Sequence, residues 1–480
     1  MIQFIKGGSP LLVKKEENFM NNKFEKKGVA LLVAMFLMIF VLVACGGDDT
    51  DGTEDNIATT DEATEDSGAA GEEIVLYFAH WNDQIQQRFY EVVELPENVR
   101  VEWVWHPNEN NVYQEELMRL LPAGEIDLFV LEADHMMNFI NEPYVLDIAD
   151  AGITNDEIAY MYEYTLEIAT SNDGAIRALA WEANPGLFVY RRSFAEEVLG
   201  VSEPEDVQPL LDNWDAFRDV AEQMNAAGYH MLSGFDDAYR VFSNNVAAPW
   251  VNENDEIIID DNIWNWVDQT ADFTANGFNN MGALWSDEWT LGKGSEGTVF
   301  GYFHAPWGIN FVHRDRAMDD PDGPHEVGNG TFGDWAAVRG PEPFFWGGTW
   351  IVGYANTEHP ELVGEIMRQM TIDQDNLETI TNVFQDFVNN RAVAERIANS
   401  DFESAFLGGQ NHIALLLDAA DEISMAHVGP YDQTMTESFQ DAFGDYFESI
   451  AAGGDFTREQ ALNNFFTTVT TLHPWLVRPE

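Results

Sequence analysis

Residues 74–93 read IVLYFAHWNDQIQQRFYEVV, and the fold is predicted outward from this stretch. The apolar run 74–78 is typical of a buried strand. A polar turn follows at 81–83, and residues 84–93 carry apolar side chains at helical spacing. The stretch therefore predicts a strand, a short polar connection and a helix.

The same order of elements repeats directly afterwards. Residues 99–105 alternate like a second strand, 113–121 have helical periodicity, and 126–131 form a fully apolar third strand. Strands that alternate with helices predict an α/β fold with a parallel, doubly wound sheet. Ligands bind such sheets beyond the carboxyl ends of the strands. The candidate binding residues at those ends are Trp81, Asp83, Glu132 and Asp134.

The single cysteine of the chain, Cys45, directly follows the apolar run 28–44. Lysines precede this run, and small residues at its end complete the arrangement of a secretory signal. Residues 42–45, LVAC, resemble the lipobox of bacterial lipoproteins, in which the cysteine is diacylated and becomes the first residue. The alternative is a transmembrane anchor, which needs about 20 apolar residues and no cysteine at the junction. We expect a lipoprotein signal peptide at 1–44 and a lipid anchor on Cys45.

Residues 45–71 are acidic and contain almost no apolar side chains, which predicts a flexible linker. The expected location is therefore extracytoplasmic, with the protein anchored by lipid to the outer face of the cell membrane. The folded part is long enough for two domains.

The chain is strongly acidic, with 84 acidic and 23 basic residues and a net charge of −61. Such a field repels nucleic acid and anionic lipid headgroups, so neither is an expected partner. An acidic site for cations would fit the charge. Adaptation of a secreted surface to a saline or alkaline medium fits better, because the acids are spread along the whole chain.

Several short motifs occur in a fixed order after residue 72. They are AGEIDLF at 123–129, the segment 178–192 that ends in YRR, WDAF at 214–217, GK at 292–293, PW at 306–307, GPEPFFWGG at 340–348 and the closing segment 453–462. Each is weak alone, but together they resemble the extracellular solute-binding lipoproteins of carbohydrate ABC importers, family 1, the group that includes maltose-binding protein.

That resemblance implies a two-lobed periplasmic-binding-protein fold of type II. Each lobe would be a sheet flanked by helices, with the ligand cleft between the lobes. We expect lobe 1 at 72–179 plus 333–372 and lobe 2 at 180–332 plus 373–480. Partners implied by the family are a carbohydrate ligand and the ABC permease subunits in the membrane, and a monomer is expected.

A sugar cleft needs polar side chains for hydroxyl groups and aromatic rings for the C–H faces. Further candidates of this composition are Glu182, Asn184, Trp307, Trp346, Gly347 and Tyr431. Tyr431 is included because maltose-type binders supply an aromatic side chain from this region. Core packing is the alternative for each tryptophan. A solvated surface position is the alternative for Glu132, Asp134 and Glu182.

No motif predicts a metal site, a cofactor or a catalytic residue. The histidines form no HExxH-type pair, and a second cysteine is absent from the sequence. We therefore expect a binding protein rather than an enzyme. Two alternatives stay open: a secreted glycoside hydrolase that uses two carboxylates, and a sugar-sensing lipoprotein that reports to a membrane sensor kinase.

Overall fold

The computed structural model describes residues 72–108 and 111–479. The expected signal peptide at 1–44, the lipidation site Cys45 and the linker at 45–71 lie outside the described residues, so these assignments stay predictions. Among the described residues, no helix combines the length and apolarity that crossing a bilayer would require.

Five strands form the first sheet, in the order β2-β1-β3-β8-β4. They are β1 (Ile74–His80), β2 (Val99–Trp105), β3 (Leu128–Glu132), β4 (Leu179–Ala180) and β8 (Thr349–Gly353). β1 pairs in parallel with β2 and β3, which confirms the prediction for this part of the chain. β8 instead pairs antiparallel with β3 and β4, so the sheet is mixed.

Three strands form the second sheet, in the order β6-β5-β7. They are β5 (Leu187–Arg191), β6 (Gly301–His304) and β7 (Trp335–Val338). Both pairings are antiparallel. All residues of these strands are buried, because helices cover the sheet and leave no solvent face for alternating polar residues.

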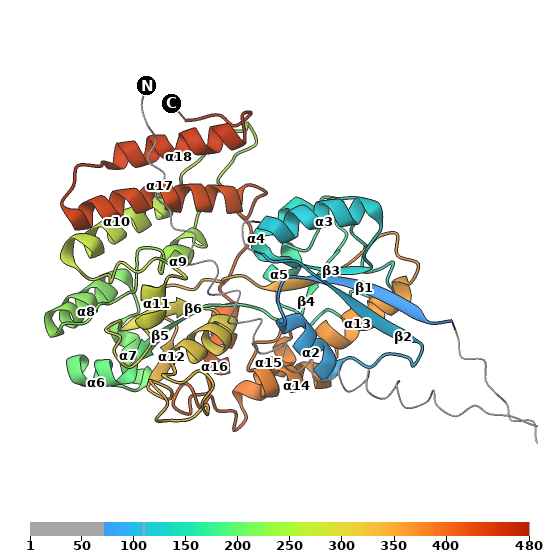
Figure 1. The fold of residues 1–480 in the computed structure, drawn as a ribbon, viewed down its shortest axis with the longest axis horizontal. Coiled ribbons are helices and arrows are strands. Elements are labelled where there is room, and N and C mark those ends of the chain that lie inside the picture. The colour runs from blue at the N-terminus through green and yellow to red at the C-terminus, as the bar shows by residue number, and fades with distance from the viewer. Residues whose placement is uncertain (1–71, 109–110, 480) are drawn as a thin grey trace, which may run out of the picture. The chain divides into compact units, whose positions relative to one another are not determined.

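Helices surround both sheets. The helices α2 (Gln84–Val92), α3 (Val112–Ala123), α4 (Ala133–Phe139), α5 (Glu163–Glu167) and α13 (Pro360–Thr371) accompany the first sheet. The helices α14 (Gln374–Phe384), α15 (Arg391–Ala398) and α16 (Ile413–Ala420) follow in sequence, with α14 packed on α2 and α13, α15 on α14, and α16 on α15. The others are α6 (Arg192–Leu199), α7 (Pro204–Val207), α8 (Trp214–Ala227), α9 (Tyr239–Ser243), α10 (Asp261–Asn276), α11 (Asp287–Leu291), α12 (Arg314–Ala317), α17 (Asp432–Ala452) and α18 (Arg458–Leu472). The described residues also include a 3-10 helix at Gln208–Leu210 and a π-helix at Gly308–His313. Figure 1 shows α17 lying between α18 and α10.

Local sequence signals explain where several helices begin and end. Asn213 caps α8 by accepting a hydrogen bond from the backbone N–H of Ala216 at 2.9 Å, and Gly228 ends it with φ +94°. Thr457 and Gln460 form a capping box at the start of α18. These caps satisfy backbone groups that the first and last helical turns leave free.

The strand pairing moves the predicted lobe boundaries in two places. Residues 333–338 were assigned to lobe 1, but β7 pairs with β5 in the second sheet. Residues from 373 onward were assigned to lobe 2, but α14 packs on α2 and α13, next to the first sheet. The chain therefore returns to the first sheet between β7 and β8, through the glycine-containing segment 339–348. The sequence could not reveal this, since the apolar β7 suits either sheet.

Candidate functional site

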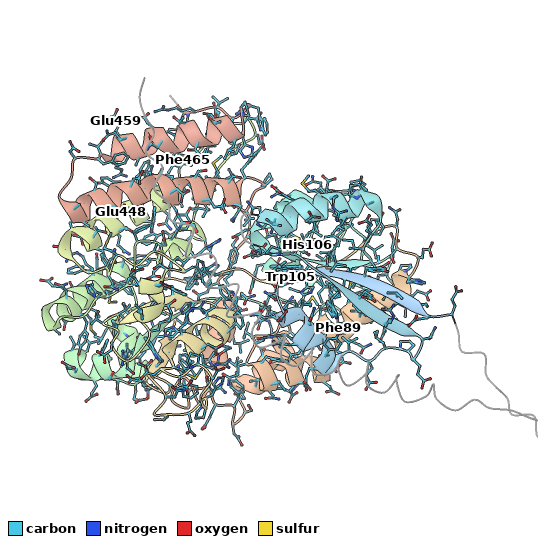
Figure 2. All side chains as sticks on the ribbon, viewed as in Figure 1. Phe89, Trp105, His106, Glu448, Glu459 and Phe465 are labelled. Carbon is cyan, nitrogen blue, oxygen red and sulfur yellow. The ribbon has the colours of Figure 1, made fainter. Side chains whose placement is uncertain are left out.

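The carboxyl ends of β1 and β2 carry two tryptophans. Trp81 is half-buried, and its ring packs edge to face on Tyr113 with 5.2 Å between the ring centres. Trp105, labelled in Figure 2, is 56% exposed, and its Nε1 donates a hydrogen bond to the carbonyl oxygen of Trp81 at 3.0 Å. Asp83 is exposed and stands at the start of α2. This end of the sheet thus presents aromatic surface.

The carboxyl end of β3 leads into two acidic residues with different surroundings. Burial raises the pKa of Glu132 to about 7, and the neighbouring Asp134 adds to the effect. Asn108 Nδ2 donates a hydrogen bond to Glu132 Oε2 at 3.3 Å. Burial would also raise the pKa of Asp134, but the charge of Arg240 holds it below its usual value. Glu132 therefore takes up a proton near neutral pH, whereas Asp134 stays ionised.

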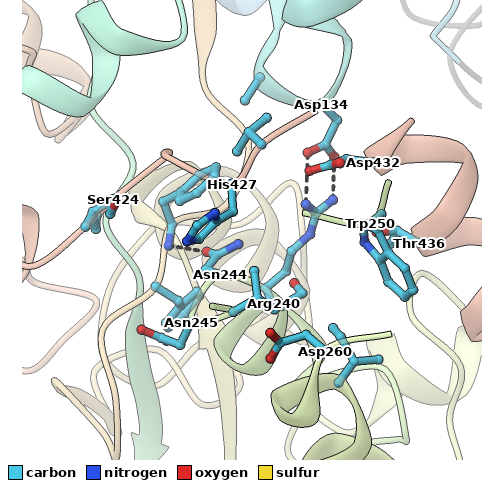
Figure 3. Close-up of a pocket in the computed structure, with 18 of the residues that line it drawn as sticks. Asp134, Arg240, Asn244, Asn245, Trp250, Asp260, Ser424, His427, Asp432 and Thr436 are labelled. Carbon is cyan, nitrogen blue, oxygen red and sulfur yellow. Dashed lines mark hydrogen bonds and ion pairs between the residues drawn. The ribbon is translucent and has the colours of Figure 1, made fainter. Parts of the chain in front are cut away.

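An ion pair joins α4, beside the first sheet, to α9, beside the second. Arg240 Nη1 donates to Asp134 Oδ1 at 2.9 Å, and Nη2 donates to Oδ2. The two side chains are 20% and 13% exposed. Figure 3 shows the guanidinium facing the carboxylate, with Asp432 beside the pair. A bidentate geometry of this kind fixes both the distance and the orientation of the groups that it joins.

Three tryptophans, Trp285, Trp307 and Trp346, form a cluster. Trp307 Nε1 donates to the carbonyl oxygen of Trp346 at 2.8 Å, and the two rings meet edge to face. The ring of Trp285 lies nearly parallel to that of Trp307, with 6.2 Å between centres and 16° between planes. Trp346 is 9% exposed and packs mainly in the core, whereas Trp285 is 52% exposed.

Gly347 connects the tryptophan cluster to Glu132. Its φ of +67° lies in the left-handed region, and a Cβ at this position would lie 3.3 Å from Trp307 Nε1 and 3.6 Å from Glu132 Oε1. Glycine is required here because the backbone passes close to both side chains. A ligand-binding role for Gly347 stays a prediction.

Asp236 adds a carboxyl group on the side of Trp285. Its Oδ2 accepts a hydrogen bond from the backbone N–H of Leu284 at 3.3 Å, and Trp285 is the next residue. Burial raises the pKa of Asp236 to about 7, and the charges of Asp237 and Asp441 add to the rise. Asp441 lies on α17, where it also acts on Glu437, which in turn lies within range of Asp134 and Arg240.

These contacts and charge interactions connect side chains associated with both sheets. We define the candidate site as the following residues: Glu132, Asp134, Asp236, Arg240, Trp285, Trp307, Glu437 and Asp441. It combines carboxylates with indole rings, a composition that can bind hydroxyl groups and apolar sugar faces together.

A cavity of about 280 Å³ adjoins the candidate site and shares Asp134 and Arg240 with it (Figure 3). Its wall also includes Asn244, whose Oδ1 accepts a hydrogen bond from the backbone N–H of Phe345 at 2.7 Å. Burial raises the pKa of Asp432, another wall residue, to about 7. Among the described residues, no group of His, Cys, Asp and Glu side chains is arranged to hold a metal ion.

Glu182, Asn184 and Tyr431 are predicted residues outside the candidate site, although the carbonyl oxygen of Asn184 accepts a hydrogen bond from the backbone N–H of Trp346 at 3.1 Å. Glu182 is 3% exposed, so the alternative of a solvated surface acid is wrong for it; burial raises its pKa to about 8. Asn184 is also 3% exposed and approaches the backbone at Gly348. The hydroxyl of Tyr431 accepts a hydrogen bond from Trp475 Nε1 at 3.0 Å. A ligand-binding role for these three residues stays a prediction.

Sequence reasoning missed five residues of the candidate site, namely Asp236, Arg240, Trp285, Glu437 and Asp441, and also the exposed Trp105 at the end of β2. One available signal was the scarcity of basic residues, because an arginine in so acidic a chain must have carboxylate neighbours. Trp285 has φ +69°, which is a strained conformation for a bulky residue, and no local sequence motif predicts this conformation.

Comparisons with known proteins support the architecture. Neither a scan against protein-family models nor a search of curated proteins finds a match. Among solved structures, an extracellular solute-binding protein of family 1 aligns with TM-score 0.68 and 16% identity, covering 82% of this chain and 99% of the other. An ABC-transporter-associated binding protein from B. animalis subsp. lactis Bl-04, in complex with β-1,6-galactobiose, aligns with TM-score 0.64 and 15% identity, covering 85% and 100%.

The galacto-N-biose-/lacto-N-biose I-binding protein of an ABC transporter from Bifidobacterium longum also aligns, with TM-score 0.64 and 15% identity, covering 85% of this chain and 99% of the other. At such low identity the likeness establishes the fold, and it confirms the prediction from the sequence motifs. The chain thus has the two-lobed, type II α/β fold of the extracellular solute-binding proteins of family 1.

Proposed function

We propose that this chain is the extracytoplasmic substrate-binding protein of an ABC importer and that it captures a carbohydrate, either a monosaccharide or an oligosaccharide. The observation that carries the proposal is the candidate site, in which carboxylates and tryptophans from both sheets lie around one region. Structures with this fold are described as complexes with galactobiose, lacto-N-biose, maltose and cycloalternan, which supports a saccharide as the ligand class.

The proposed mechanism is capture without chemical conversion. The sugar's hydroxyl groups donate to Glu132 and accept from Asn108, while an apolar face of the sugar packs on Trp307 or Trp285. Because these side chains come from both lobes, a bound sugar stabilises the arrangement in which the lobes are close together. A membrane permease would recognise that arrangement and accept the sugar.

A saccharide screen tests this proposal. The protein lacking residues 1–45 is mixed with mono- and oligosaccharides at millimolar concentration, and melting temperature and tryptophan fluorescence are recorded. At a ligand concentration 100 times the Kd, the expected stabilisation is about 2.7 kcal/mol. If no saccharide changes either the melting temperature or the tryptophan fluorescence, the proposal is contradicted. Recovery of the ligand unchanged, with no reducing sugar released, distinguishes binding from hydrolysis.

Substitution of Trp307 tests whether the saccharide binds at the candidate site. Trp307→Ala removes the indole that contacts both Trp285 and Trp346, so saccharide binding should weaken at least tenfold. The matched control is Tyr90→Ala, which removes an exposed aromatic side chain from α2 (68% exposed) and should leave binding unchanged. Equal affinities for the two variants would place the ligand elsewhere.

We further propose that Cys45 carries the lipid that holds the protein at the outer face of the membrane. Two acyl chains suffice for stable anchoring. Cys45→Ala should move the protein from the membrane fraction to the medium, whereas Ser67→Ala, in the same acidic linker, should leave it membrane-bound. Membrane retention of the Cys45 variant would contradict the lipid anchor.

A further inference from the structure

The motif GK at 292–293 contains the only lysine that follows residue 45 in the sequence. The side chain of Lys293 is completely buried, although lysine is among the residues that are least often found in a protein interior. A methionine of similar length could fill the same space without the cost of removing an amino group from water. The amino group of Lys293 therefore needs an explanation other than packing.

The amino group of Lys293 contacts both the ring and the main chain of Trp289. Its Nζ lies 3.0 Å from the centre of the Trp289 ring and 3.9 Å from the centre of the Tyr302 ring. The same Nζ donates a hydrogen bond to the carbonyl oxygen of Trp289 at 3.0 Å. Burial lowers the pKa of Lys293, and the charge of Asp237 opposes this shift. An amine can donate this hydrogen bond with or without its additional proton, so the contact with Trp289 does not depend on the charge of Lys293.

Neighbouring residues hold Trp289 and Lys293 in this arrangement. Trp289 is buried, and its Nε1 donates a hydrogen bond to Asp237 Oδ1 at 3.1 Å. A Cβ at Gly292 would lie 2.4 Å from the hydroxyl oxygen of Tyr302, so glycine is required directly before the lysine. The two residues of the motif thus place an amino group between the rings of Trp289 and Tyr302.

Trp289 in turn supports the exposed tryptophan of the candidate site. The ring centres of Trp289 and Trp285 are 5.2 Å apart. Trp285 is half exposed and has a left-handed φ, so the surrounding structure, and not a local preference, sets the position of its ring. Contacts therefore lead from buried Lys293 through Trp289 to a ring that faces solvent. A ring that is already held in place binds a ligand more tightly, because less motion is lost on binding.

We propose that Lys293 is a positioning residue for saccharide binding, and that it acts through Trp289 to hold the ring of Trp285 in the orientation that packs on the apolar face of the sugar. Lys293 itself is buried and does not contact the ligand. This inference rests on the proposed function, and it identifies the residue that orders the aromatic surface before the sugar arrives.

A double-mutant cycle tests the path from Lys293 to the sugar. The probe is the tightest binder among glucose, maltose, cellobiose and lactose, measured by titration calorimetry on the protein lacking residues 1–45. Lys293→Met and Trp285→Ala should each weaken binding by about tenfold, since both remove the ordered ring. The double variant should lose no more than Trp285→Ala alone, because Lys293 acts only through that ring. Losses that add, to about a hundredfold in the double variant, would overturn the inference.

The matched control separates positioning from general destabilisation. Val469→Ala shortens a buried side chain of α18, so it should lower the melting temperature but leave saccharide affinity unchanged. An affinity loss in the Val469 variant equal to that in Lys293→Met would show that Lys293 has only a structural role, and would overturn the inference.

The ligand-free protein offers a second measurement that needs no saccharide. The near-UV circular dichroism spectrum depends on fixed tertiary packing, so subtracting the spectrum of Trp285→Phe isolates the signal of Trp285. This difference should disappear in the Lys293→Met background and persist in the Val469→Ala background. A difference that persists in both, or disappears in both, would overturn the inference. If none of the saccharides binds, the proposed function is contradicted, and this spectrum still decides whether Lys293 positions Trp285.

Discussion

Replacement of Arg88 by methionine removes the cation from a buried group of three ionisable residues, Arg88, Asp386 and Glu182. Arg88 Nε and Nη2 donate to the carboxylate of Asp386 at 2.8 and 2.7 Å, and the two side chains are 8% and 2% exposed. The carboxyl of Glu182 is close enough for its charge to act on Arg88. The guanidinium also lies 4.2 Å from the ring centre of Phe384.

The expected loss follows from the burial of this pair. Removing one partner of a buried ion pair costs about 3–5 kcal/mol, because the other charge stays in the interior without compensation. With an unfolding entropy of about 2.1 cal/mol/K per residue over roughly 400 folded residues, this loss lowers the melting temperature by about 4–6 °C. Methionine fills much of the arginine's volume, so the effect reports charge more than packing.

Calorimetry of three variants checks this reasoning. Arg88→Met should show the full loss, and the double variant Arg88→Met/Asp386→Leu should recover most of it, because apolar residues can replace a buried pair without a net cost. Arg218→Met is the control, since Arg218 pairs with Asp272 at the surface with 41% and 37% exposure, and it should lose less than about 1 kcal/mol. A double variant as unstable as the single one would refute the argument.

Three further predictions concern pH and the candidate site. The folded protein holds the pKa of Glu182 at about 8, above its unfolded value, so the stability linked to this group is complete below about pH 4.5 and is lost as the pH rises through 8. The melting temperature should therefore fall between pH 5 and 8, and it should fall less steeply in Glu182→Gln. A melting temperature that rises over this range would contradict the prediction. Asp134→Asn breaks the bidentate pair with Arg240, so X-ray scattering of the ligand-free protein should give a larger radius of gyration, and an unchanged radius would show that the pair does not hold the lobes together. Gly347→Ala and Gly453→Ala both force alanine into a left-handed conformation, which should lower the free energy of unfolding by about 1–2 kcal/mol. A Cβ at Gly453 meets nothing within 4 Å, so this variant is the control, and only the Gly347 variant should weaken saccharide binding.

Local patterns were enough to locate the early part of the fold. The predicted strand at 99–105 matches β2 at both ends, and the helix predicted at 113–121 corresponds to α3, which ends at Ala123 before Gly124 with φ +68°. The period of apolar side chains reports which face of an element is buried, and glycine marks where a helix can end, so both features are readable along the chain.

Local patterns were not enough to assign elements to sheets. The apolar run of β7 suits either sheet, and only its pairing with β5 places it in the second. The parallel sheet was predicted from residues 74–131 alone, and β8, which the chain forms only after crossing back from the second sheet, runs antiparallel to β3. Strand direction depends on the path of the whole chain, which periodicity does not record.

The candidate site likewise combines features that are readable from local sequence with features that only the folded chain determines. The sequence by itself predicted Glu132 and Asp134 from their positions after a strand and Trp307 from the residue types that a sugar cleft needs, and the structure brings them together through Gly347 and Arg240. It could not show that Asp236, more than a hundred residues from Asp134, accepts a hydrogen bond from the backbone N–H of Leu284, the residue before Trp285. Chemistry-bearing residues can be recognised one at a time in a sequence, but the charge balance of a site depends on distances between remote segments, and those distances exist only once the chain has folded.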